Sequence, residues 1–146
     1  MWYLKSFDTL TNAQLYQILR LRSEIFVVEQ DCVYQDMDDK DKTALHFFKE
    51  EVQQIVAYTR LFKPGDYYKE ASIGRVVVKE SRRSTGLGHL LIDRSIEQIE
   101  KTMGKIPIKI GAQVYLKRFY EKHHFKKISE EYLEDGIPHI HMLRKL

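Results

Sequence analysis

The chain has 146 residues, which is the size of one ordinary globular domain. With 43% hydrophobic and 31% charged residues and only 7 Gly and 3 Pro, it is not a disordered, collagen-like or low-complexity chain. The formal charge of +3 is the difference between 24 basic and 21 acidic residues. Overall charge therefore identifies neither a nucleic-acid-binding nor a membrane-binding protein.

The single cysteine, Cys32, excludes an internal disulfide framework and a cysteine-rich zinc site, and it fits a reducing compartment. No apolar run approaches the roughly 20 residues needed to cross a bilayer, and the first residues lack the pattern of a signal peptide. We therefore expect one cytoplasmic domain over residues 1–146, with no membrane partner.

The first half of the chain predicts a strand, a helix, a loop and a hairpin. Residues 2–7 are aromatic-rich and typical of an edge strand, and Thr11 and Gln14 have the spacing of a capping box. Apolar residues then recur at helical spacing, which predicts a helix over about 11–26. The acidic segment 29–41 predicts a loop, and two β-rich stretches predict a hairpin, 43–49 and 53–62.

The second half predicts a central strand followed by a long helix. Residues 72–79 contain a run of three valines, which favours a strand buried on both faces at the centre of a sheet. A wide apolar stripe then predicts a helix from Leu87 to Met103, ending before Gly104. The remaining expected elements are a strand at 106–110, a helix at 114–122 and a hairpin of 125–133 with 139–145.

The turn between the central strand and the long helix contains Gly86 and Gly88. A helix N-terminus offers unpaired backbone amides and a partial positive charge, and glycines let an anion approach the backbone. Arg82 and Arg83 add positive charge beside it. The turn therefore predicts a pyrophosphate site, although a plain glycine-containing turn with solvated arginines is the alternative. Its spacing fits neither the G-x-G-x-x-G nor the G-x-x-x-x-G-K-[ST] motif.

The spacing Arg83-x-x-Gly86-x-Gly88 resembles the acetyl-CoA signature of the GNAT superfamily of N-acetyltransferases. Residues 116–125, which include Tyr120, are similar to the second GNAT signature helix. The stretches 21–38 and 132–140 resemble the ElaA-type subfamily, so the likeness covers nearly the whole chain. Two residues depart from the pattern: His124 replaces a usual glycine, and Glu80 stands where many relatives carry proline.

The resemblance implies a single GNAT-like α/β domain. Its sheet would be twisted, mixed, mostly antiparallel, flanked by helices and splayed near residues 76–79. The resemblance also implies acetyl-CoA as co-substrate, without a metal. Its pantetheine arm would bind the backbone of Val76 and Val78, and an amide near Val77 or Val78 could polarise the thioester carbonyl. The pyrophosphate would sit on the amides of Arg83, Ser84, Thr85, Gly86, Leu87 and Gly88. The alternative is that the valines are only core residues.

The implied reaction is direct attack of a primary amine on acetyl-CoA. Because an alkylammonium with a pKa near ~10.4 is protonated at neutral pH, a base must remove a proton. Glu29 is the first candidate for this base and His139 the second. Tyr120 is the family-matched donor of a proton to the leaving sulfur, with a structural hydrogen bond as its alternative role.

Two other functions are compatible with the sequence. One is a catalytically silent acyl-CoA-binding module, and the other, ranked last, is a basic nucleic-acid module that uses Lys79, Arg82 and Arg83. From the implied acetyltransferase reaction we expect the amine of a small molecule, a protein or a peptide as partner, and no nucleic acid. The sequence leaves open whether the protein forms a homodimer. The acidic segment 31–41 is either a solvated surface or an attractor of cationic amines.

Overall fold

A computed structural model describes residues 1–145 and contains eight strands in one sheet. The strands are β1 (Trp2–Ser6), β2 (Leu45–Glu51), β3 (Gln54–Phe62), β4 (Ala71–Val78), β5 (Ile108–Gln113), β6 (Lys126–Lys127), β7 (Tyr132–Glu134) and β8 (Ile137–Arg144). Their order is β1-β2-β3-β4-β5-β8-β6, and β7 also pairs with β8. All pairs are antiparallel except β4 with β5, so the predicted mixed, mostly antiparallel sheet is confirmed.

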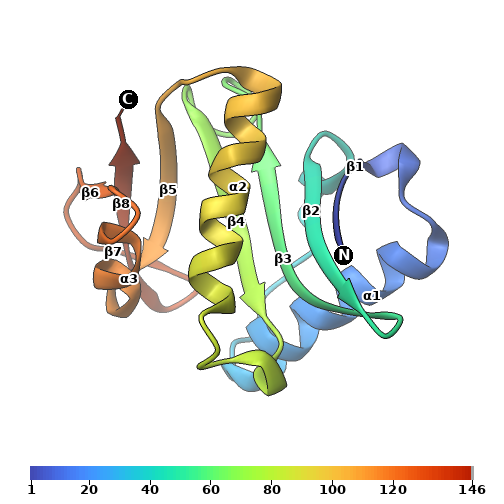
Figure 1. Cartoon of the computed structure of the whole chain (residues 1–146). Coiled ribbons are helices and arrows are strands. Elements are labelled where there is room, and N and C mark those ends of the chain that lie inside the picture. Colours follow the sequence, from blue (N-terminus) through green and yellow to red (C-terminus); the bar gives the residue numbers. More distant parts are fainter. Residues whose placement is uncertain (146) are drawn as a thin grey trace.

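Helices cover both faces of this sheet. They are α1 (Asn12–Arg22), which continues into the π-helix η2 (Ser23–Glu29), α2 (Leu87–Met103) and α3 (Lys117–Glu121). Short 3-10 segments are η1 (Phe7–Thr9), η3 (Lys40–Lys42), η4 (Glu80–Arg82) and η5 (Val114–Leu116). Figure 1 shows α2 lying across one face and α1 behind the other. No helix within residues 1–145 combines the length and the hydrophobicity that crossing a membrane requires.

The start of α1 is fixed by the predicted capping box. The Thr11 hydroxyl accepts a hydrogen bond from the Gln14 amide at 3.1 Å, and the Gln14 side chain accepts one from the Thr11 amide at 3.0 Å. These two bonds satisfy amides that the helix itself leaves unpaired. The helix therefore begins where the sequence predicts.

Each face of the sheet has its own apolar core. Leu91, Ile92 and Ile99 of α2 pack on one face, and Ile18 and Leu21 of α1 pack on the other. Because β3 lies between both cores, all its residues after Gln54 are buried. The strand predicted to be buried on both faces, β4, does lie at the middle of the sheet, but it is only partly buried. That part of the prediction is wrong because β4 borders an opening in the sheet.

The opening arises because β4 and β5 pair at only two positions. Ala71 is opposite Ile108 and Ser72 is opposite Lys109, after which the strands diverge (Figure 1). In β4, Arg75 has a φ of +48°, and the register with β3 shifts at the same place, which marks a β-bulge. The predicted splay is therefore confirmed, and it begins at Ile73, earlier than the expected residues 76–79.

The helix predicted over 11–26 is α-helical only as far as Arg22, and from Ser23 it is a π-helix. In η2 the hydrogen bonds join residues five apart, from the Gln30 amide to the Ile25 carbonyl at 3.1 Å and from the Cys32 amide to the Val27 carbonyl at 3.1 Å. An apolar stripe at 3.6-residue spacing does not reveal one extra residue per turn. Such π-helical turns often occur at functional sites, and η2 ends at Glu29, one of the candidate bases.

In the turn after α3, a histidine occupies a backbone conformation that favours glycine, which should cost conformational free energy. His124 has a φ of +70°, a left-handed conformation that costs most L-residues about 1–2 kcal/mol. The His124→Gly variant is therefore expected to be more stable by about 0.5–1 kcal/mol, because glycine removes the strain but loses more backbone entropy. Thermal unfolding measures this directly. A His124→Ala control should gain nothing, and an unchanged or lower midpoint for His124→Gly would show that the turn is not strained.

Candidate active site

A cleft of about 490 Å³ lies where β4 and β5 separate. It collects residues from distant parts of the chain: η2, β4, the N-terminus of α2, α3 and the β7–β8 turn. The predicted site residues that line it are Glu29, Val76, Val77, Val78, Arg83, Gly88, Tyr120 and His139. The others, Ser84, Thr85, Gly86 and Leu87, belong to the turn that leads into α2 but do not line the cleft themselves.

The turn before α2 leaves its backbone amides available. Gly86 is the N-cap residue, with a φ of +82° and no side chain to cap the helix. The first helical hydrogen bond runs from the Leu90 amide to the Gly86 carbonyl at 3.1 Å, so the amides of Leu87, Gly88 and His89 have no acceptor within the helix. An anion in this position would meet three free donors and the positive end of the helix dipole.

The two arginines of the turn are already paired with glutamates. Arg82 donates to the Glu51 carboxylate and Arg83 to the Glu29 carboxylate, each at 2.7 Å. Arg83 also donates to the Val78 carbonyl at 3.4 Å. The positive potential expected from these side chains is therefore partly neutralised, and the anion-binding capacity of the turn rests chiefly on its amides.

Strand β4 presents a backbone edge to the cleft. From Ile73 to Val78 its side toward β5 has no strand partner among the described residues. Val77 is buried in the core under α1, whereas Val76 and Val78 are half-buried against the α2 core and also line the cleft. The valines are therefore core residues, and their role in binding a cofactor stays a prediction.

Tyr120 reaches the cleft from α3. Its side chain is buried, and its ring packs edge-on against Phe119 and Phe125, with centroids 5.1 Å and 6.0 Å away. Burial, and more weakly the neighbouring Tyr115, raises the pKa of the Tyr120 hydroxyl above its ordinary value. The hydroxyl is therefore protonated at neutral pH, and no hydrogen bond ties it to another described residue.

The two candidate bases differ in their partners. The Glu29 carboxylate is held by Arg83, as described above. His139 Nδ1 lies 2.7 Å from the Ile137 carbonyl, and since a carbonyl only accepts, Nδ1 carries the hydrogen. The other nitrogen, Nε2, then has a lone pair when the ring is neutral, and it lies 3.4 Å from the Glu134 carboxylate. Of the two candidates, Glu29 is paired with an arginine and His139 lies beside a carboxylate.

A buried ion network joins the end of α1 and strand β3 to the acidic segment 36–41. Arg22, which is fully buried, donates to Asp36 at 2.9 Å and to Asp41 at 2.8 Å. Arg60 donates two hydrogen bonds of 2.8 Å each, one to each carboxylate oxygen of Asp38, and it donates a third to Asp41 at 3.0 Å. Asp36, Asp38 and Asp41 of the acidic segment are therefore paired with arginines, whereas Asp31 and Asp39 are exposed.

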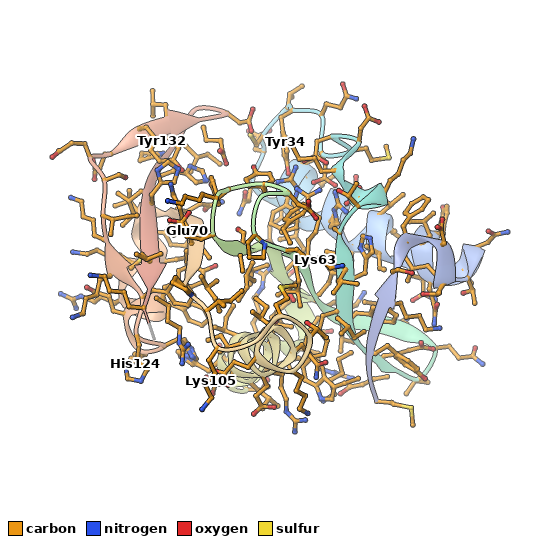
Figure 2. The ribbon with its side chains drawn as sticks, turned by 90° about the horizontal axis from the view of Figure 1, so that it is seen from above. Tyr34, Lys63, Glu70, Lys105, His124 and Tyr132 are labelled. Carbon is orange, nitrogen blue, oxygen red and sulfur yellow. The ribbon has the colours of Figure 1, made fainter. Side chains whose placement is uncertain are left out.

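The same network reaches the cleft through Arg75. This residue of the β4 bulge donates to Oδ1 of Asp36 at 2.8 Å, and the Tyr34 hydroxyl donates to the same oxygen at 3.1 Å. Both Tyr34 and Arg75 line the cleft. Figure 2 shows Tyr34 and Tyr132 on the face of the sheet away from α2, where the segment 32–41 and β7 come close together. A hydrogen bond from the Cys32 thiol to the Asp135 carbonyl, 3.3 Å long, links these two segments.

Sequence reasoning did not identify the arginines of this network. The available signal was an arginine inside each of three apolar elements, namely Arg22 in α1, Arg60 in β3 and Arg75 in β4. A charge within an otherwise buried element must find a partner. The acidic segment 36–41 supplied the partners, but their pairing depends on tertiary contacts that no spacing rule specifies. Within residues 1–145, no group of three or more His, Cys, Asp or Glu side chains is arranged to hold a metal ion.

The split, mostly antiparallel sheet with helices on both faces is the fold of the acyl-CoA N-acyltransferases. The family model described as "Acetyltransferase (GNAT) domain" matches residues 11–146. The chain therefore belongs to the GNAT acetyltransferase family.

Known proteins support this assignment over the whole chain. Protein ElaA of Escherichia coli is 38% identical over 99% of this chain and 96% of its own, and its crystal structure superposes with a TM-score of 0.93. A Pseudomonas aeruginosa structure described as an acyl-CoA N-acyltransferase is 39% identical over 99% of both chains, also with a TM-score of 0.93. An aminoglycoside 6'-N-acetyltransferase complexed with coenzyme A shares the fold alone, at 15% identity and a TM-score of 0.71, covering 98% of this chain and 96% of its own.

The buried network makes the fold sensitive to acid. Burial opposes ionisation of Asp38 and Asp41, but their arginine partners outweigh it: the pKa of Asp38 falls to about 2, and that of Asp41 also lies below 3.8. Their stabilisation is therefore complete above the unfolded pKa of 3.8 and disappears as the pH falls toward 2. We expect Asp41→Asn to lower the free energy of unfolding by about 3 kcal/mol, because it leaves buried guanidinium charge uncompensated.

Urea unfolding at neutral pH and at acid pH measures this effect. The matched control is Asp39→Asn, an exposed neighbour whose φ of +67° asparagine tolerates. The control should change stability little, and Asp41→Asn should lose less than the wild type between pH 4 and pH 2. Equal stabilities for the two variants would contradict the role given to the network.

Proposed function

We propose that this protein transfers the acetyl group of acetyl-CoA to a primary amine. The observation that carries the proposal is the meeting, in one cleft, of the unpaired β4 edge, the uncapped N-terminus of α2 and the protonated Tyr120. The likeness to a protein described as an acyl-CoA N-acyltransferase, at 39% identity, supports the same reaction class. A cytoplasmic location stays a prediction from the composition.

The residues present fit a ligand that has a diphosphate and a long amide-containing arm. The amides of Leu87, Gly88 and His89 would hold the diphosphate, and Gly86 gives that turn the left-handed conformation that other residues rarely adopt. The free edge of β4 at Val76 to Val78 would hydrogen-bond the arm as a neighbouring strand does. When bound, acetyl-CoA supplies an activated acyl group.

The proposed chemistry needs three proton transfers, which two side chains carry out. His139 Nε2 takes a proton from the alkylammonium group, and the freed amine nitrogen attacks the acyl carbon, so that a C–N bond forms and the C–S bond breaks. The Tyr120 hydroxyl gives its proton to the departing sulfur, and the proton that the nitrogen loses as the amide forms restores the tyrosine. Such assistance typically accelerates a reaction by about 10²- to 10⁴-fold.

The acceptor side of the cleft is acidic. Glu134 and Asp135 from the β7–β8 turn line it beside His139, whereas Glu29 is neutralised by Arg83. Their negative potential would favour a cationic amine and orient it toward Nε2 of His139. We therefore assign the base to His139, and we assign to Glu29 the positioning of Arg83 near the cofactor turn.

The test is to incubate the protein with acetyl-CoA and a panel of primary amines, detecting acetylated products by mass spectrometry and free CoA by thiol release. We expect at least one amine to be acetylated. For that amine, Tyr120→Phe should lower turnover by about 10²-fold while it binds acetyl-CoA as the wild type does. Binding of acetyl-CoA without any acetylated product would instead favour the silent acyl-CoA-binding module.

Two further variants separate the candidate bases in the same assay. His139→Asn keeps a donor for the Ile137 carbonyl but removes the proton acceptor. It should lower turnover by about 10²-fold, whereas Glu29→Gln should mainly weaken acetyl-CoA binding and change turnover little. The reverse pattern would assign the base to Glu29.

A further inference from the structure

A chain of three polar side chains lies beside the N-terminus of α2. His123 Nδ1 lies 2.7 Å from the Asp93 carboxylate, and His123 Nε2 lies 2.8 Å from His89 Nδ1. His89 also stacks on the ring of Phe119, with centroids 4.5 Å apart. The remaining nitrogen, His89 Nε2, bonds to none of the described residues and is the free end of the chain.

The proton positions in this chain follow from its hydrogen bonds. Since a carboxylate only accepts, His123 Nδ1 carries a hydrogen, and the contact between the two rings needs one hydrogen between their facing nitrogens. Without an extra proton that hydrogen sits on His89 Nδ1, so Nε2 of His89 is an acceptor. With one extra proton, on either ring, Nε2 of His89 becomes a donor. A single proton therefore changes the free end from a lone pair to an N–H group.

The surroundings of His89 favour the state without the extra proton when no ligand is present. Partial loss of solvation, followed by the charges of His123 and Lys122, holds the pKa of His89 below its ordinary value of 6.5, and only Asp93 acts in the opposite direction. These are the charged and titratable groups that α2, α3 and the turn after it present to His89. A phosphate near Nε2 would reverse this balance by stabilising the positive charge.

The array stands next to the proposed cofactor turn. The backbone amide of His89 is the third of the free amides at the start of α2, and Phe119, on which His89 stacks, lines the cleft. His124, the neighbour of His123, lies on the α2 side of the sheet in Figure 2, whereas Tyr34 and Tyr132 lie on the opposite face. The array is therefore remote from the groups that handle the amine.

We propose that the Asp93–His123–His89 array is a proton-coupled phosphate-binding element, which takes up one proton as coenzyme A binds and donates from His89 Nε2 to a phosphate oxygen. This inference rests on the proposed function, because it needs the cofactor to bind at the N-terminus of α2. The phosphate oxygen belongs either to the diphosphate or to the 3'-phosphate of the adenosine, which share the same anionic chemistry.

Calorimetric titration with CoA at pH 7.5, in Tris and in Hepes, measures the protons taken up, because these buffers differ in ionisation enthalpy. At this pH a phosphate monoester is already dianionic, since its second pKa is about 6. We expect uptake of about half a proton or more per CoA in the wild type and near none in His89→Asn. Between pH 6.5 and 8.0, wild-type affinity should fall about threefold more than that of the variant.

Controls separate the array from its neighbours and from the cofactor site itself. His124→Asn replaces an exposed histidine outside the array and should leave proton uptake unchanged, and Asp93→Asn should reduce it. Uptake retained with 3'-dephospho-CoA assigns the contact to the diphosphate, and uptake lost assigns it to the 3'-phosphate. If the wild type and His89→Asn both bind CoA and take up equal numbers of protons, the role of the array is wrong, but the proposed function still stands. No binding of CoA by either protein overturns the proposed function as well.

Discussion

The separation of β4 from β5 after two paired positions is the constraint on which the rest of the structure depends. A continuous ladder would consume the backbone donors and acceptors of β4, and the cleft would close. The bulge at Arg75 turns the strand away, and the ion pair of Arg75 with Asp36 fixes that turn to the segment 32–41. The functional opening is thus stabilised by charges at its edge rather than by the apolar core.

The same arrangement places different chemistry on the two sides of the cleft. At the α2 side the hydrogen-bond donors are backbone amides. The fold sets their positions, so a side-chain substitution changes their ability to donate only a little. At the other side the cleft is lined by side chains from outside the helices: Tyr34 from the loop after η2, Glu134 from β7 and His139 from β8. In the proposed function, the amides would hold the diphosphate of the cofactor and the side chains would contact the acceptor amine.

Much of the fold could be predicted because its signals are local. The capping box of Thr11 and the apolar stripe of α2 depend on neighbouring residues only, and both are confirmed. The glycine pattern at Gly86 and Gly88 likewise marked the turn, because a left-handed conformation limits the residue type. The left-handed turn at His124 was expected only from the resemblance to the GNAT family, whose members usually have glycine there.

What could not be predicted depends on partners distant in sequence. Arg22, Arg60 and Arg75 meet the acidic segment only after the sheet has formed, so their charges seemed unconnected along the chain. The pairing of Glu29 with Arg83, 54 residues away, has the same origin and changes which residue is the better base. The array of His89, His123 and Asp93 joins α2 to the turn after α3, and it has no sequence signature.

We propose that backbone amides on both sides of the split hold the cofactor. Amide resonances of the ¹⁵N-labelled protein, followed by NMR during titration with acetyl-CoA, test it most directly. We expect the signals of Val76 to Val78 and of Leu87 to His89 to shift together and to saturate with one dissociation constant. Stationary signals for both segments in a folded sample at millimolar acetyl-CoA would contradict the account.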